Sequence, residues 1–166
     1  MMVVVTPHAE LFHRPSPEID FKLVRVERLT KHDIGIEEAI LSFDLHADLS
    51  SCFSWNTKQI FMYIEAEFYS GGAGAGEPRS RGAEHNSIVI WDAIVKTREE
   101  AVLDLKRARN EYRLYDRDGI SLKGNALNVT VAWNVMPKVG VLYFDKVTFP
   151  NVKLPNEYIV TTNPIN

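Results

Sequence analysis

A chain of 166 residues with 45% hydrophobic and 25% charged residues is long enough for one globular domain, which would bury about 70% of its unfolded surface. The formal net charge of -3 gives no reason to expect nucleic acid or an anionic membrane surface as a partner. Cys52 is the only cysteine, which excludes a disulfide within the chain. We expect it to be a buried and unreactive thiol.

Residues 1–18 form an extended leader or tether in our interpretation, because Pro7, Pro15 and Pro17 interrupt them and no long periodic run is present. The apolar run over residues 1–5 is far shorter than the ~20 residues that a membrane-spanning helix needs. It also lacks the basic flank and cleavage site of a signal peptide. We therefore expect one folded domain over residues 19–166.

Alternation of apolar and polar residues predicts three strands in the first half of the chain, over 21–29, 43–49 and 60–68. The last two are the longest and most regular, and we expect them to be the central strands. The residues predicted to face the core are Phe43, Leu45, Ala47 and Leu49 in one strand and Ile60, Met62, Ile64, Ala66 and Phe68 in the other.

Residues 70–86 contain four glycines within 71–76 and few side chains that could build a core, so we predict a flexible loop. A phosphate-binding loop would need a Lys-Ser or Lys-Thr pair, or a helix opening directly after the glycines. Neither is present in the sequence. We therefore do not expect a nucleotide site here.

Further strands follow at turn-separated intervals. Residues 86–96 are apolar on both faces, which predicts a strand covered on both sides, and the basic residues 106–109 are interpreted as a solvated turn. Short pieces lie at 102–105 and 112–115, and Gly119 ends a turn that requires positive φ. A long strand is predicted at 125–136, with strands at 141–147 and 157–161 after it. About eight mostly antiparallel strands indicate an all-β fold, a β-sandwich.

Two groups of polar side chains could carry chemistry. Asp44, His46 and Asp48 share a strand face and could ligate a metal, but the sequence supplies no further ligand cluster. Glu65 and Glu67 share another face, yet nothing in the sequence indicates a catalytic cleft around them. We interpret both groups as solvated strand faces, and we expect no metal, cofactor or catalytic residue. Asn128-Val129-Thr130 is a glycosylation sequon, which is a weak signal alone.

The three tryptophans, Trp55, Trp91 and Trp133, are the candidates for contact with a protein partner, since tryptophan contributes disproportionately to binding. The sequence leaves two alternatives open: all three belong to the core, or one of them docks. Asn56 joins the candidates because it follows Trp55 in a connection between strands, where docking residues are commonly placed.

Several ordered blocks resemble the lumenal domain of the signal peptidase complex subunit 3 family, covering roughly Phe21 to Tyr158. The blocks that carry the resemblance are Ser42–Leu49, Ser54–Phe68, Ile88–Val95, Leu122–Asn125 and Asn128–Pro137. The resemblance implies a non-catalytic accessory subunit in the endoplasmic-reticulum membrane, with the catalytic and other subunits as partners. It also implies glycosylation at Asn128.

Members of that family are single-pass proteins whose N-terminal helix anchors a lumenal domain, and the start of this sequence departs from that pattern. Either the chain begins after the anchor or it is a soluble relative. The alternative function is a β-sandwich protein- or peptide-binding module unrelated to signal peptidase. An enzyme with its own carboxylate or metal centre is a more distant third hypothesis.

Overall fold

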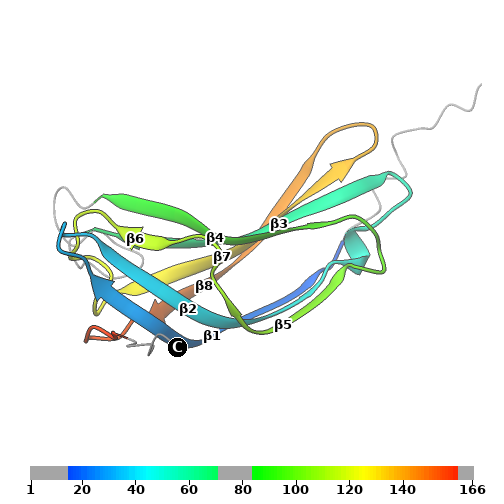
Figure 1. Cartoon of the computed structure of the whole chain (residues 1–166). Helices are drawn as coiled ribbons and strands as arrows, with labels where there is room; N and C mark the ends of the chain where they lie inside the picture. Colours follow the sequence, from blue (N-terminus) through cyan, green and yellow to red (C-terminus); the bar gives the residue numbers. More distant parts are fainter. Residues whose placement is uncertain (1–14, 71–83, 161–166) are drawn as a thin grey trace, which may run out of the picture.

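The structure is a computed structural model that describes residues 15–70 and 84–160 (Figure 1). Two antiparallel sheets pack face to face, which confirms the predicted all-β sandwich. Sheet A has the order β1-β2-β5, with β6 also paired to β2, and sheet B has the order β4-β3-β7-β8. The strands are β1 (Glu18–Lys31), β2 (Glu37–Asp48), β3 (Thr57–Tyr69), β4 (His85–Val95), β5 (Val102–Arg109), β6 (Leu114–Asp116), β7 (Ala126–Pro137) and β8 (Tyr143–Lys153). One 3-10 turn, η1 (Ser50–Cys52), connects β2 to β3.

β2 and β3 occupy the interior of their sheets, as predicted, and they supply the centre of the core. Every second residue of each strand is turned inward, and the nine residues predicted to face the core are at most 1% exposed. β7 adds Leu127, Val129, Val131 and Trp133 to the same core. Phe21 of β1 and Phe149 of β8 join the two sheets, with ring centroids 5.8 Å apart. The regular period of two made these faces predictable.

The prediction for β4 was wrong in one respect. β4 is an edge strand of sheet B and is not covered on both sides, since Val89 and Ile94 are exposed. The register with β3 shifts between Ile64 and Glu65, which marks a β-bulge. Before the bulge Ile88 and Ile90 face the core, and after it Trp91 and Val95 face the core. A bulge inserts one extra residue and reverses the alternation, which made both faces look apolar in the sequence.

The basic residues 106–109 were also misplaced, because they lie within β5 and not in a turn. Arg107 has φ 51 at an irregularity in the β2–β5 register, and its backbone N–H donates to Asp44 Oδ1 at 2.8 Å. Ala108 still packs against the core. The strand was hidden in the sequence because three of its residues are cationic and solvent-facing.

The end of the sandwich that holds the β1–β2 hairpin is closed by buried polar groups. Glu37 accepts hydrogen bonds from the Leu122 backbone N–H and the Tyr158 hydroxyl, both at 2.7 Å. The bond to Glu37 raises the pKa of Tyr158 to about 12. Asp116 accepts from the Ser121 backbone N–H at 3.1 Å, and Gly119 has the positive φ predicted for its turn. We call this region the polar end.

The C-terminal part differs in detail from the prediction. β8 runs to Lys153, well beyond the predicted 147, and Ile159 forms a single bridge with Leu29 in place of a full strand. Most of the predicted leader (1–18) and of the predicted loop (70–86) lies outside the described residues. The ends of that loop are described, and the Ser70 backbone N–H donates to the Glu84 carbonyl at 2.8 Å.

Candidate functional site

Trp55 lies in the connection between η1 and β3, at the end of the sandwich opposite the polar end, and its side chain is 63% exposed. The surrounding loop is tied down by polar contacts. The Thr57 hydroxyl donates to the Cys52 carbonyl at 3.0 Å and accepts from the Ser54 backbone N–H at 3.0 Å. The indole is therefore presented outward by an ordered turn. We call this region the Trp55 end.

Asn56 fastens the β7–β8 hairpin to that turn. Its side-chain amide donates to the Val139 carbonyl at 2.7 Å and accepts from the Val139 backbone N–H at 3.1 Å, which reproduces the pairing of a strand residue. The Lys138 backbone N–H also donates to the Asn56 carbonyl at 2.6 Å. Asn56 is only 4% exposed, so its role here is to position the hairpin, which we define as the tip (residues 138–142).

A cleft of about 540 Å³ opens between the turn and the hairpin. Its walls are formed by the turn that holds Trp55, by the β7–β8 hairpin and by the first described residue of the chain. The lining residues are Pro15, Cys52, Ser54, Trp55, Asn56, Thr57, Val135, Pro137, Val141 and Tyr143. Burial raises the pKa of the Cys52 thiol to about 11, so this thiol stays protonated at neutral pH.

The structure separates the tryptophans that the sequence could not distinguish. Trp133 is 1% exposed and Trp91 is 7% exposed, and both pack in the core, whereas Trp55 is exposed. Of the four candidate docking residues, Trp55 is the one whose side chain a partner could contact directly.

The outer face of sheet B carries a second exposed apolar surface, close to the Trp55 end. Phe61 of β3 pairs with Ile94 of β4 and Asn134 of β7, and Asn134 pairs with Phe144 of β8. Ile94 is 53% and Phe144 47% exposed. Tyr63, which stacks on Phe61 at 5.7 Å, and Met136 lie on the same face of the sheet. We call this set the outer patch: Phe61, Tyr63, Ile94, Met136 and Phe144.

The outer face of sheet A is charged instead. Paired residues place Asp20 beside His46 and His46 beside Asp104, and Lys106 forms an ion pair with Asp104 at 3.0 Å. The two faces therefore differ in chemistry. A face covered by protein is normally depleted of charge, which favours the outer patch over sheet A as a docking surface.

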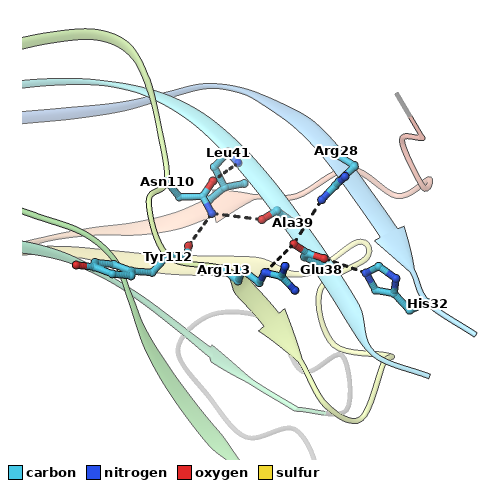
Figure 2. Close-up of polar contacts among 8 residues, drawn as sticks. All are labelled: Arg28, His32, Glu38, Ala39, Leu41, Asn110, Tyr112 and Arg113. Carbon is cyan, nitrogen blue, oxygen red and sulfur yellow. Dashed lines mark hydrogen bonds and ion pairs between the residues drawn. The ribbon is translucent and has the colours of Figure 1, made fainter. Parts of the chain in front are cut away.

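Glu38 is the centre of a partly buried ionic cluster on the polar end (Figure 2). Its carboxylate contacts His32 at 2.9 Å, Arg28 at 3.4 Å and Arg113 at 3.8 Å. Burial acts to raise the pKa of Glu38, but the hydrogen bond from His32 and the charges of Arg113 and Arg28 lower it below its usual value. The cluster ties β1 and β2 to the segment before β6. We interpret it as structural because the Glu38 carboxylate is held by side chains from three segments of the fold.

Asn128 lies on the outer face of sheet B, paired with Glu67 of β3, and is half-buried. Its Oδ1 accepts from the Asn151 backbone N–H at 3.3 Å. Thr130 of the same sequon is buried, with its hydroxyl 3.0 Å from that of Thr148. Asn128 is six residues from Asn134 along β7, or roughly 20 Å at the rise of a strand, so it lies beyond the outer patch toward the polar end.

Comparison with known proteins gives the family. The family described as signal peptidase subunit matches residues 1–157. The chain belongs to the signal peptidase subunit family. It is 32% identical over 134 residues to signal peptidase complex subunit 3 of Drosophila melanogaster, 34% over 108 residues to that of Saccharomyces cerevisiae and 37% over 113 residues to that of Homo sapiens. These alignments cover 80%, 65% and 68% of this chain.

The same alignments cover 66%, 53% and 54% of those relatives, so the chain spans between about half and two thirds of their length. No helix within residues 15–70 and 84–160 is long and apolar enough to cross a membrane. The family match confirms the resemblance that the sequence blocks indicated; of those blocks, Leu122–Asn125 belongs to the polar end and Asn128–Pro137 to β7.

The structure also places the side chains that suggested other chemistry in the sequence. Asp44 and Asp48 accept backbone N–H groups from Arg107 and Ser50, and Glu65 accepts the Ser87 hydroxyl. In the part of the chain that the structure describes, no group of three or more His, Cys, Asp and Glu side chains is arranged to hold a metal ion.

The tip and the outer patch were missed by sequence reasoning. The sequence predicted that one strand ends at residue 136 and the next begins at 141, with no role for the residues between them, although Val139, Val141 and Leu142 form an apolar stretch where a hairpin turn is usually polar. That departure was the available signal. The outer patch gave no signal of its own, because strand residues on the two faces of a sheet can be assigned only when the pairing is known.

Proposed function

We propose that this chain is the lumenal domain of a non-catalytic accessory subunit of the endoplasmic-reticulum signal peptidase complex, supporting a separate catalytic subunit in the removal of signal peptides. Family membership carries the proposal. Three curated relatives bear the name signal peptidase complex subunit 3, a name that implies partner subunits. The unrelated binding module is the less favoured alternative, since it would leave a match over residues 1–157 unexplained.

The finer parts of the proposal are the topology, the docking surface and the modification. The protein would cross the membrane once, through an N-terminal helix, and hold this domain in the lumen. The domain would dock on the catalytic subunit through the outer patch, with Trp55 beside it. Asn128 would carry an N-linked glycan on the same sheet, at the more polar half of the face, where it leaves the outer patch uncovered.

The test is co-purification of the tagged full-length gene product from its native cell after gentle solubilisation. Recovery of the catalytic signal peptidase subunit in near-equal amount is the expected result, and a lone protein or unrelated partners would overturn the proposal. Ile94→Asp and Phe144→Asp place a charge on the outer patch and should reduce recovery roughly tenfold, since buried unpaired charge is costly at an interface. The matched control is Val24→Asp, an exposed apolar residue of sheet A.

The glycan is tested on the same material. Endoglycosidase treatment should increase the electrophoretic mobility of the wild-type protein and leave that of Asn128→Gln unchanged. If the treatment leaves the mobility of the wild-type protein unchanged, Asn128 is not glycosylated. The docking proposal would not be affected by that result.

A further inference from the structure

The tip is the most exposed apolar part of the described chain. Val139 is 75%, Val141 91% and Leu142 49% exposed, and Trp55 is exposed beside them. Figure 1 shows the β7–β8 hairpin extending away from sheet A, beyond the body of the sandwich. Aliphatic side chains at a projecting turn gain nothing from the fold itself, so their placement requires another explanation.

The tip is also held in place. The two hydrogen bonds between the Asn56 amide and Val139 fix the hairpin to the Trp55 turn, and the Lys138 ammonium donates to the Trp55 carbonyl at 3.0 Å. These contacts fix the start of the tip, Lys138 and Val139, beside Trp55. The apolar side chains are presented outward as a fixed group.

The chain enters the fold at this same end. Pro15 lines the cleft beside Val141, the Ser16 backbone N–H donates to Ser51 Oγ at 3.1 Å, and β1 starts opposite Asp48. The residues that precede Pro15 are therefore attached next to Trp55 and the tip, whereas the polar end lies at the far end of the strands.

We propose that Trp55 and the tip insert into the interface of a lipid bilayer. The group has the composition of such contacts: aliphatic residues at the apex, an exposed tryptophan, and Tyr143 and Lys138 behind them, with no carboxylate between Pro137 and Phe144. Tryptophan and tyrosine are enriched at membrane interfaces, and the Lys138 ammonium, which donates to the Trp55 carbonyl, adds a positive charge beside them. A narrow, convex apex suits lipid better than a flat protein surface, which needs a broad area.

This contact goes beyond the proposed function, in which a separate helix provides the membrane attachment. It orients the domain with its long strands running away from the bilayer and the polar end farthest from the bilayer. The outer patch then lies close to the membrane, and Asn128 lies roughly 20 Å farther out along β7.

The experiment places the 166-residue chain, with an N-terminal hexahistidine, on phosphatidylcholine vesicles that contain a nickel-chelating lipid. Tethering keeps every variant at the surface at the same high effective concentration. Vesicles with brominated acyl chains quench a tryptophan only when it reaches the lipid. We expect quenching of one of the chain's 3 tryptophans in the wild-type protein and none in Trp55→Phe, since Trp91 and Trp133 are buried.

The double variant Val141→Asp and Leu142→Asp should reduce the quenching roughly tenfold, because aspartate partitions poorly into the bilayer. Ile34→Asp is the matched control: Ile34 is an exposed apolar residue of the β1–β2 turn, at the opposite end, and the substitution should leave quenching unchanged. Circular dichroism and a thermal melt of each variant establish that it is folded.

Wild-type quenching no greater than that of the folded double variant would overturn the proposal. If lipid quenching is absent in the wild-type protein and the double variant no longer co-purifies with the catalytic subunit, the tip contacts protein and the proposal is wrong. Failure of the complex to co-purify would leave the lipid result standing, because the vesicle experiment contains no other subunit.

Discussion

At the scale of single residues, Cys52 illustrates how the environment sets reactivity. The thiol is 3% exposed, and burial raises its pKa to about 11. A raised pKa means that the thiolate, which is the reactive form, is scarce until the pH approaches that value. We expect Cys52 to resist iodoacetamide at pH 8 in the folded protein and to react fully in urea. Rapid labelling of the folded protein at a rate independent of urea would contradict this.

Asn110 is a second residue whose side chain makes the hydrogen bonds that a neighbouring strand would otherwise provide. In Figure 2 its amide bridges the gap between β5 and β6 along β2: the Leu41 backbone N–H donates to Oδ1 at 2.8 Å, and Nδ2 donates to the Tyr112 carbonyl at 2.8 Å. Asn110→Ala removes the acceptor of the part-buried Leu41 N–H, whereas the exposed Tyr112 carbonyl can bond to water instead. We expect it to lower the free energy of unfolding by about 2 kcal/mol, measured by urea unfolding at constant m-value.

The matched control for that measurement is Asn86→Ala. Asn86 also donates its side-chain amide to a backbone carbonyl, that of Glu84, but the contact is exposed and local. Its loss should cost less than about 0.5 kcal/mol. Equal losses for the two variants would show that Asn110 is not bridging the strands.

At the scale of elements, regular alternation was predictable from the sequence and its interruptions were not. β2, β3 and β7 keep one inward-facing set over their central residues, and the core residues predicted for β2 and β3 were assigned correctly. β4 and β1 contain bulges, and each bulge shifts the inward-facing set by one position. Val24 lies at the first bulge of β1 and is exposed, although it stands between residues that the alternation of 21–29 would bury. Bulges depend on the partner strand, which the sequence of one strand does not specify.

The Glu38 cluster makes the junction of β1, β2 and β6 sensitive to pH. The pKa of Glu38 is lowered in the folded protein, so its contribution to stability is present above the unfolded value of about 4.3 and is lost as the pH falls through the folded value. Glu38→Gln should cost about 1–3 kcal/mol at pH 7. The difference from wild type should shrink below about pH 4.

The measurement is urea unfolding of both proteins between pH 3 and pH 7. A stability difference that stays constant over this range would mean that the charge of Glu38 is not responsible. A difference that grows toward low pH would have the wrong sign for a carboxyl whose folded pKa is lowered.

At the scale of the whole molecule, the turn-separated strands predicted the fold and the family blocks indicated the role, whereas the surfaces could not be predicted from the sequence. Asn56 and Val139 are 83 positions apart, and nothing in either segment indicates that they meet. The same holds for Ile94 and Phe144, which come to one face only through the pairing of β4, β3, β7 and β8. Surfaces assembled from distant strands depend on register, and register is a property of the whole sheet.

Shortening the β3–β4 connection would test whether residues 71–83 contribute to the stability of the fold. Ser70 and Glu84 already form a closed pair, with the Ser70 N–H donating to the Glu84 carbonyl at 2.8 Å and the Glu84 N–H donating to Ser70 Oγ at 2.9 Å. Replacing residues 71–83 with Asn-Gly, a sequence suited to a two-residue hairpin turn, should raise the free energy of unfolding by about 1.5 kcal/mol, because a shorter connection costs less closure entropy. Thermal and urea unfolding measure the change. A loss of stability would show that the replaced residues make contacts on which the sandwich depends, and the glycine-rich stretch would then be part of the domain and not a passive loop.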